Sequence, residues 1–96
     1  MYLEELNASR RVLGDEHPDT LTSISNLAGL YQSQGRYEEA EPLYLECIKG
    51  RRRILGNKHP DTISTIYNLG DMYRTQGDMV KAQPLLDEYD ELKAKA

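Results

Sequence analysis

The sequence predicts an all-α protein in which antiparallel helical hairpins stack on one another. The first reason is a repeat: the eight residues from Leu13 to Thr20 return, partly changed, as Leu55 to Thr62, 42 positions later. Over residues 13–42 and 55–84, fourteen of thirty aligned positions are identical, and a period of this size is typical of stacked repeats. The second reason is that apolar residues recur at helical spacing inside each copy, between prolines and glycines that start and end helices. No stretch predicts a strand.

The first predicted element is a helix over residues 1–13. Its sequence echoes the end of the next copy, since Tyr2-Leu3-Glu4 matches Tyr44-Leu45-Glu46. We therefore expect one domain over residues 1–96 with three parts. These are the second helix of a truncated preceding repeat (1–12), repeat one (13–54) and repeat two (55–96).

The next helix is predicted from residue 18 to residue 33. Proline is tolerated in a first helical turn and an acid there complements the helix dipole, so Pro18 and Asp19 mark the start. Gly35 marks the end, because glycine readily adopts positive φ. The apolar stripe between them consists of Leu21, Ile24, Leu27, Ala28 and Tyr31.

The second helix of repeat one is predicted from residue 37 to residue 54, with Gly56 ending it. Pro42 lies near its start, where we expect a mild bend and not a break. Repeat two follows the same plan, with helices at 60–75 and 79–94 and with Asp78 as a cap. The residues that the second helix of repeat one is expected to bury are Tyr37, Ala40, Leu43, Tyr44, Cys47 and Ile48.

The last helix departs from the repeat where its counterpart is apolar. Leu45 and Ile48, which we expect to face the following repeat, correspond to Asp87 and Asp90. Because two carboxylates are costly to bury, we expect this helix to be a solvent-facing cap of the array. The residues of this helix that are still expected to pack inward are Leu85, Leu86, Tyr89 and Leu92.

The bulk composition excludes several classes of protein. Hydrophobic residues make up 39% and charged residues 29%, which is too apolar for a disordered chain. A net charge of -4 disfavours a nucleic-acid partner. No apolar run approaches the roughly 18 residues of a membrane helix, and no signal peptide is visible. Cys47 is the one cysteine and cannot form an internal disulfide, which favours a reducing compartment and a cytoplasmic location.

The motif within each copy resembles the tetratricopeptide repeat. Repeat one reads Ile24-x-x-Leu27-Ala28-x-x-Tyr31, then Gly35, Ala40 and Tyr44, and repeat two reads Ile66-x-x-Leu69-Gly70-x-x-Tyr73, then Gly77, Ala82 and Leu86. A period of 42 residues and the Leu-Gly-x-x-His-Pro-Asp-Thr connector resemble the kinesin-light-chain subtype. The resemblance implies a short right-handed α-solenoid whose first helices line a concave groove for extended peptides.

The resemblance also implies which residues contact such a peptide. Asn26 and Asn68 match the family position that hydrogen-bonds a peptide backbone, and an amide offers both a donor and an acceptor. The alternative is that both amides bond to neighbouring helices. Thr22 and Ser64 replace the basic residues with which some family members clamp an acidic C-terminus, so a clamp of that type is not expected. The full set of predicted groove residues is Thr22, Ser25, Asn26, Gly29, Gln32, Ser33, Ser64, Tyr67, Asn68, Asp71, Arg74 and Thr75.

We therefore predict a non-catalytic scaffold for a protein or peptide partner, with no cofactor. The alternative function is self-assembly, since the helix at 1–13 has apolar residues to bury and no partner helix of its own before it. Stacking or exchange of helices through that N-terminal end would then give a homo-oligomer. The apolar residues concerned are Leu3, Leu6, Val12 and Leu13.

Three other patterns are assigned structural roles. His17-Pro18-Asp19 and its copy at 59–61 lack a nucleophile and a pocket, so we expect them to start helices and not to catalyse or bind a metal. Cys47 lies on an apolar helix face and is expected to be a packed thiol. For Arg51, Arg52 and Arg53, we favour a solvated helix C-terminus over the alternative of an anionic partner.

Overall fold

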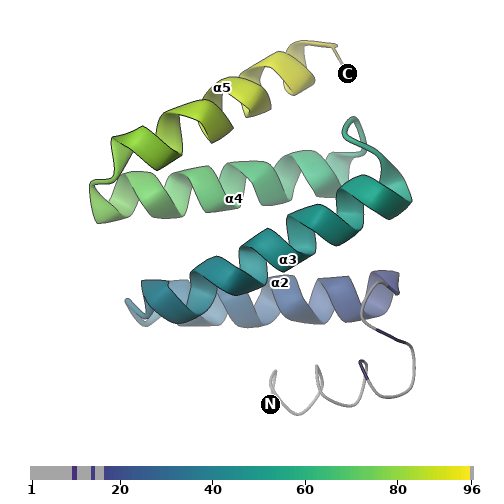
Figure 1. Cartoon of the computed structure of the whole chain (residues 1–96), viewed down its shortest axis with the longest axis horizontal. Coiled ribbons are helices and arrows are strands. Elements are labelled where there is room, and N and C mark those ends of the chain that lie inside the picture. Colours follow the sequence, from purple (N-terminus) through teal and green to yellow (C-terminus); the bar gives the residue numbers. More distant parts are fainter. Residues whose placement is uncertain (1–9, 11–13, 15–16, 96) are drawn as a thin grey trace.

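The computed structural model describes residues 10, 14 and 17–95 (Figure 1). In this part of the chain lie four α-helices: α2 (Pro18–Ser33), α3 (Tyr37–Leu55), α4 (Pro60–Gln76) and α5 (Met79–Lys95). The all-α prediction is confirmed, and each of these helices begins at its predicted residue and ends at most one residue later. The predicted helix at 1–13, and with it the N-terminal end considered for self-assembly, falls outside the described residues apart from Arg10.

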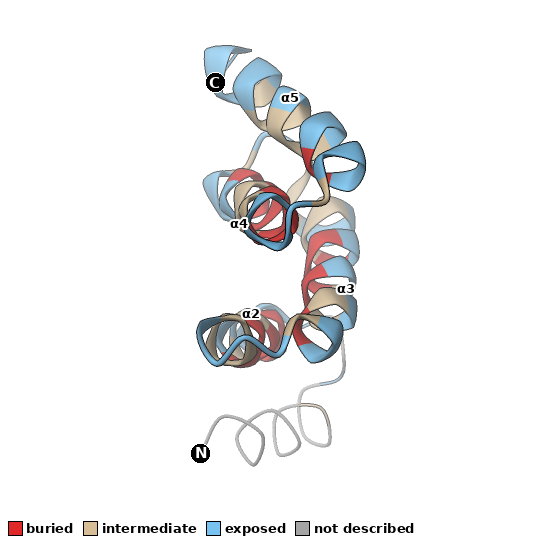
Figure 2. Cartoon of the chain, turned by 90° about the vertical axis from the view of Figure 1, so that its left-hand side faces the viewer, coloured by how far each residue is buried: buried red, intermediate tan, exposed pale blue. Residues whose placement is uncertain are grey.

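Successive helices run in opposite directions and form two hairpins, α2 with α3 and α4 with α5 (Figure 1). The hairpins stack because α3 also packs against α4. In Figure 2, α2 and α4 lie on one side of the molecule and α3 lies on the other. The first helices of the two repeats therefore share one side, as a solenoid groove requires.

A histidine side chain caps the first helix of each repeat. The Nδ1 atom of His17 accepts a hydrogen bond from the backbone N–H of Asp19 at 3.1 Å. His59 does the same for Asp61, also at 3.1 Å. Each bond satisfies one of the N–H groups that a helix start leaves without an internal partner. The predicted helix-start role of both histidines is confirmed.

The core joins the two repeats. Tyr44 and Ile48 of α3 pack in one cluster with Ile66 and Met72 of α4, and all four side chains are at most 6% exposed. A smaller cluster inside the first hairpin contains Leu21, Ile24, Leu27 and Cys47. Burial of an aliphatic side chain of this size contributes about 1.5–3 kcal/mol, so stacking and hairpin formation both stabilise the fold.

An ion pair between an arginine and a glutamate recurs with the repeat. Arg10 donates to both carboxylate oxygens of Glu46, at 2.6 and 2.9 Å. Arg52 and Glu88, each 42 positions later, form the same two-pronged pair at 2.8 and 2.8 Å. This geometry is stronger and more specific than a single contact between charges.

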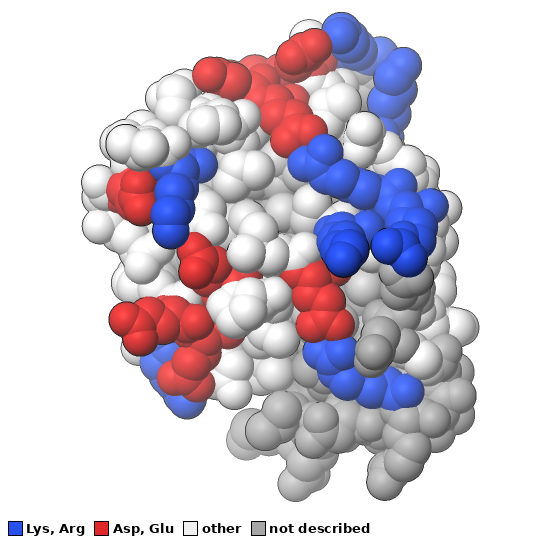
Figure 3. All heavy atoms as spheres, viewed as in Figure 1, with Lys and Arg blue, Asp and Glu red and all other residues white. Residues whose placement is uncertain are grey.

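Arg53 is exposed at the end of α3 as predicted, but Arg51 and Arg52 correct the prediction of a solvated helix C-terminus. Arg51 donates to the side-chain oxygen of Thr65 at 2.6 Å, and Arg52 is paired with Glu88. Both arginines are half-buried and tie α3 to the following repeat. Figure 3 shows, on the face of the molecule seen in Figure 1, that many of the Lys and Arg residues gather along one edge and lie next to carboxylates.

The expected contact of Leu45 with the following repeat is wrong. Leu45 is 50% exposed, whereas Ile48 is 6% exposed and packs against α4 as expected. Residues three positions apart on a helix differ in direction by about 60°, and only Ile48 points at α4. Asp87 and Asp90 are exposed, while Leu85, Leu86, Tyr89 and Leu92 pack against the core as predicted. The role of α5 as the cap of the array stays a prediction.

Candidate functional site

The predicted groove residues lie on α2 and α4, and none of them is buried. Six are exposed, namely Thr22, Asn26, Ser33, Ser64, Arg74 and Thr75. Six are partly buried, namely Ser25, Gly29, Gln32, Tyr67, Asn68 and Asp71. The stripe of polar residues is therefore a surface and not part of the core.

Asn26 and Asn68 occupy equivalent positions on neighbouring first helices. Asn26 is exposed and Asn68 is partly buried. Within the part of the chain that the structure describes, neither side-chain amide has a hydrogen-bond partner. The alternative role, bonding to neighbouring helices, therefore has no counterpart among these contacts, and both amides keep a donor and an acceptor for a ligand.

Three hydroxyl groups in the stripe turn back onto their own helices. Thr22 donates to the carbonyl oxygen of Pro18 at 3.0 Å, Ser33 to that of Leu30 at 2.8 Å, and Thr75 to that of Asp71 at 2.9 Å. A hydroxyl that has used its proton in this way can still accept a hydrogen bond. These residues can accept from a peptide N–H, but they have no proton left to donate.

Tyr44 of α3 contacts the predicted groove residues, which the sequence analysis did not anticipate. Its ring is buried, but its hydroxyl donates to Gln32 Oε1 at 2.7 Å. A Cβ atom added at Gly29 would lie 3.8 Å from the same hydroxyl oxygen. Burial, together with the nearby Cys47 and Asp71, raises the pKa of Tyr44. A tyrosine in place of an aliphatic core residue was the available signal, because a buried phenol needs a polar partner.

The same stripe on α4 carries charge and aromatic surface. Asp71 and Arg74 form an ion pair one turn apart, and hydrogen bonds to Asp71 and then to Tyr67 raise the pKa of Arg74. The ring of Tyr67 packs against that of Tyr89 on α5, with centroids 4.7 Å apart. The charges of Asp71 and Arg74 compensate each other, so the predicted groove residues on α4 carry no net charge.

An apolar hollow of about 260 Å³ lies beside the start of α4. Its walls include Pro60, Ile63 and Tyr89, and Ser64 brings it into contact with the predicted stripe. Lys58 and Lys93 also line it, and the Lys93 ammonium is 5.4 Å from the centre of the Tyr89 ring. The hollow could take an apolar side chain, with positive charge close by.

Catalytic and metal-binding arrangements find no support among the described residues. Both histidine Nδ1 atoms are occupied as helix caps. Cys47 is fully buried, its thiol donates to the carbonyl oxygen of Leu21 at 3.4 Å, and burial raises its pKa. No group of three or more His, Cys, Asp or Glu residues in residues 10, 14 and 17–95 is arranged to hold a metal ion. None of the helices described has both the length and the apolar run needed to cross a bilayer.

The comparisons with known proteins place this geometry in context. A sequence model described as tetratricopeptide repeat matches residues 1–53 and 23–89. No curated protein matches the chain. The structure is similar to BtubC (BKLC) from P. vanneervenii, with a TM-score of 0.94 and 24% identity over 99% of this chain and 37% of that one.

A second similar structure is a putative kinesin light chain from Podosopora anserina with nearly identical TPR-like repeats. Its TM-score is 0.90 and its identity 26%, over 98% of this chain and 44% of that one. The chain thus spans less than half the length of either structure.

Proposed function

Because the chain belongs to the tetratricopeptide repeat family, whose repeats generally mediate protein–protein interaction, we propose that it is a non-catalytic scaffold holding an extended peptide segment along α2 and α4. The family and the similar structures agree with the resemblance to kinesin-light-chain repeats in the sequence. Proteins of this kind are typically non-catalytic, and the finer proposal concerns the surface that contacts the partner.

The observation that carries the proposal is the pair of amides on Asn26 and Asn68. Both side chains reach the surface at the same position of successive repeats, and neither is used by the residues that the structure describes. An amide pairs with a peptide group without reading the side chain beside it. Two such amides on the first helices of successive repeats suit a ligand whose backbone crosses from one repeat to the next.

The surrounding residues support the same ligand. Gln32, held by Tyr44, and the Asp71–Arg74 pair supply fixed polar groups one to two turns after the amides on the same helices. The hollow beside Ser64 offers room for one apolar side chain at the edge of the stripe. Specificity would then come from repeat two, because none of the predicted groove residues of repeat one is charged.

The test is to select binders from a random peptide library and to measure their affinity for Asn26→Ala, Asn68→Ala and the double variant. We expect each single change to weaken binding about fivefold to tenfold, since one hydrogen bond contributes about 1 kcal/mol. The matched control is Asn57→Ala, which removes an exposed asparagine in the turn before α4. An unchanged affinity of the double variant, with an unchanged melting curve, would refute the groove role.

A further inference from the structure

Two hollows lie side by side where the turn between α2 and α3 meets the end of α4. Their volumes are about 280 and 310 Å³, and they share Tyr37, Glu38 and Gln76 as walls. None of the predicted groove residues lines either hollow. This edge of the molecule is therefore a surface separate from the proposed peptide groove.

The larger hollow already holds a cation of the protein itself. The hydroxyl of Tyr73 donates to Glu41 Oε2 at 2.6 Å, and the ammonium of Lys81 lies 3.6 Å from the same oxygen. The Lys81 ammonium is also 5.5 Å from the centre of the Tyr73 ring. An aromatic face and a carboxylate together favour a positive charge, through the ring quadrupole and through direct attraction.

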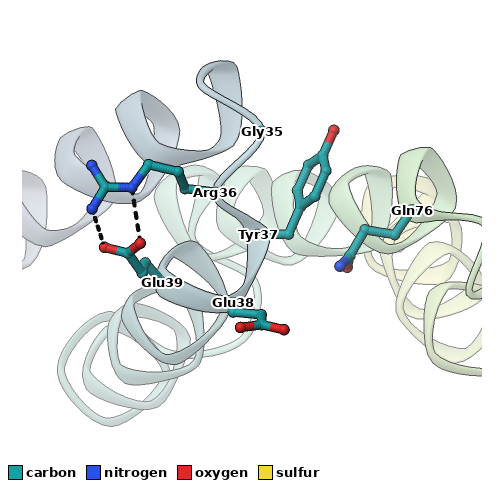
Figure 4. A pocket seen from close by; sticks show the side chains of 6 residues that line it. All are labelled: Gly35, Arg36, Tyr37, Glu38, Glu39 and Gln76. Carbon is teal, nitrogen blue, oxygen red and sulfur yellow. Dashed lines mark hydrogen bonds and ion pairs between the residues drawn. The ribbon is translucent and has the colours of Figure 1, made fainter.

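The smaller hollow also has an aromatic ring and a carboxylate, and its one lining cation, Arg36, is paired with Glu39. Figure 4 shows Tyr37 and Gln76 on opposite sides of it, with Glu38 next to Tyr37. Tyr37 is partly buried and Glu38 is exposed, and Glu38 has no ion pair with any residue in the described part of the chain. Arg36 and Glu39 line the same hollow, but the Arg36 side chain is bonded to Glu39 and lies 4.5 Å from the centre of the Tyr31 ring, so it does not pair with Glu38.

We propose that the hollow between Tyr37 and Gln76 receives a lysine or arginine side chain from a partner protein. The Tyr37 ring would lie against the aliphatic stem or the cationic group, and Glu38 would neutralise the charge. A metal ion is a poor fit, because hard cations need several oxygen ligands and this hollow offers one unpaired carboxylate. The neighbouring arrangement of Tyr73, Glu41 and Lys81 is the internal example of the same chemistry.

The experiment is an NMR titration of the ¹⁵N-labelled chain with three blocked tripeptides, Gly-Arg-Gly, Gly-Lys-Gly and Gly-norleucine-Gly. We expect the two cationic peptides to shift the backbone amides of Gly35 to Glu39 and of Gln76 saturably, and the norleucine peptide, which has the stem without the charge, to leave them unchanged. Glu38→Gln should weaken the cationic peptides at least fivefold. The matched control is Asp90→Asn. Asp90 is an exposed carboxylate on α5 that does not line this hollow, so its replacement should leave the affinity unchanged.

Two results would overturn the proposal. One is an equal response to norleucine and to lysine. The other is a loss of affinity in Asp90→Asn as large as that in Glu38→Gln, which would indicate general attraction to an acidic protein. Tyr37→Leu tests the aromatic wall, but Tyr37 also packs against the core, so Glu38→Gln is the deciding variant.

Discussion

The two repeats agree in the capping of their first helices and in an Arg–Glu ion pair, and they differ where the second helix meets its own first helix. The histidine caps and the Arg–Glu pairs recur with nearly the same distances. The second helices, however, contain Gly50 in α3 and Leu92 at the equivalent position of α5. The caps and ion pairs are thus the same in both repeats, while the packing of the second helix on the first differs between the two hairpins.

In repeat one, Gly50 allows the two helices of the hairpin to pack closely. Leu21 of α2 lies against the backbone of α3 at this residue, and a Cβ atom there would be 2.6 Å from Leu21 Cδ2. Leu21 is consequently 1% exposed, whereas Ile63 at the same position of repeat two is 8% exposed and lines the apolar hollow. Gly50 lets α3 approach Leu21 closely, which shields Leu21 from solvent. In repeat two, Leu92 stands in place of this glycine, and Ile63 lines a hollow.

The largest effect is expected from giving repeat one the residue of repeat two. Gly50→Leu should destabilise the fold by about 2–3 kcal/mol, because Leu21 is buried and cannot move away without disturbing its neighbours. For a chain of this size that corresponds to a fall in melting temperature of roughly 4–8 °C per kcal/mol, measurable by circular dichroism.

The reverse exchange, Leu92→Gly, is the matched comparison for Gly50→Leu. It should cost less, since Leu92 is only partly buried. Equal losses for the two variants would show that the hairpins are packed alike after all.

A medium effect is expected for the ion pair between repeats. A double-mutant cycle with Arg52→Ala and Glu88→Ala should give a coupling of about 1 kcal/mol, because the pair is two-pronged and each side chain is about two-thirds buried. The coupling should fall in high salt. Additive single losses would mean that the pair is only a surface contact, and the recurring geometry would then not contribute to stacking.

The smallest effect is expected for the caps, and it should be the same in both repeats. His17→Ala and His59→Ala each remove one acceptor at an exposed helix start, for which we expect a loss of about 0.5 kcal/mol, the low end of the range for N-caps. Replacement by asparagine, another side chain that can cap, should restore most of the stability. A much larger loss for one histidine would indicate a further contact that the other lacks.

Much of the fold could be predicted because the residues that start and end the helices occur in both copies of the repeat. Proline at residues 18 and 60 and glycine at residues 35 and 77 bound the first helices, and two agreeing copies remove the ambiguity of a single pattern. The placement of the polar stripe on the surface follows from the same periodicity.

Side-chain direction and partner choice could not be predicted in this way. Leu45 looks as apolar as Ile48 in the sequence, and only the position of α4 decides which of them is covered. The roles of Arg51 and Arg52 likewise depend on Thr65 and Glu88, which lie on the next hairpin. Tyr44 was assigned to the core, and its hydroxyl became part of the candidate site because Gly29 and Gln32 happen to face it.

The sealed position of Cys47 has a practical consequence. Its sulfur is fully buried between α2 and α3, so an alkylating reagent can reach it only when the first hairpin separates. With no other thiol in the sequence, the rate of that modification would report the opening of a single unit of the array, with no label to introduce.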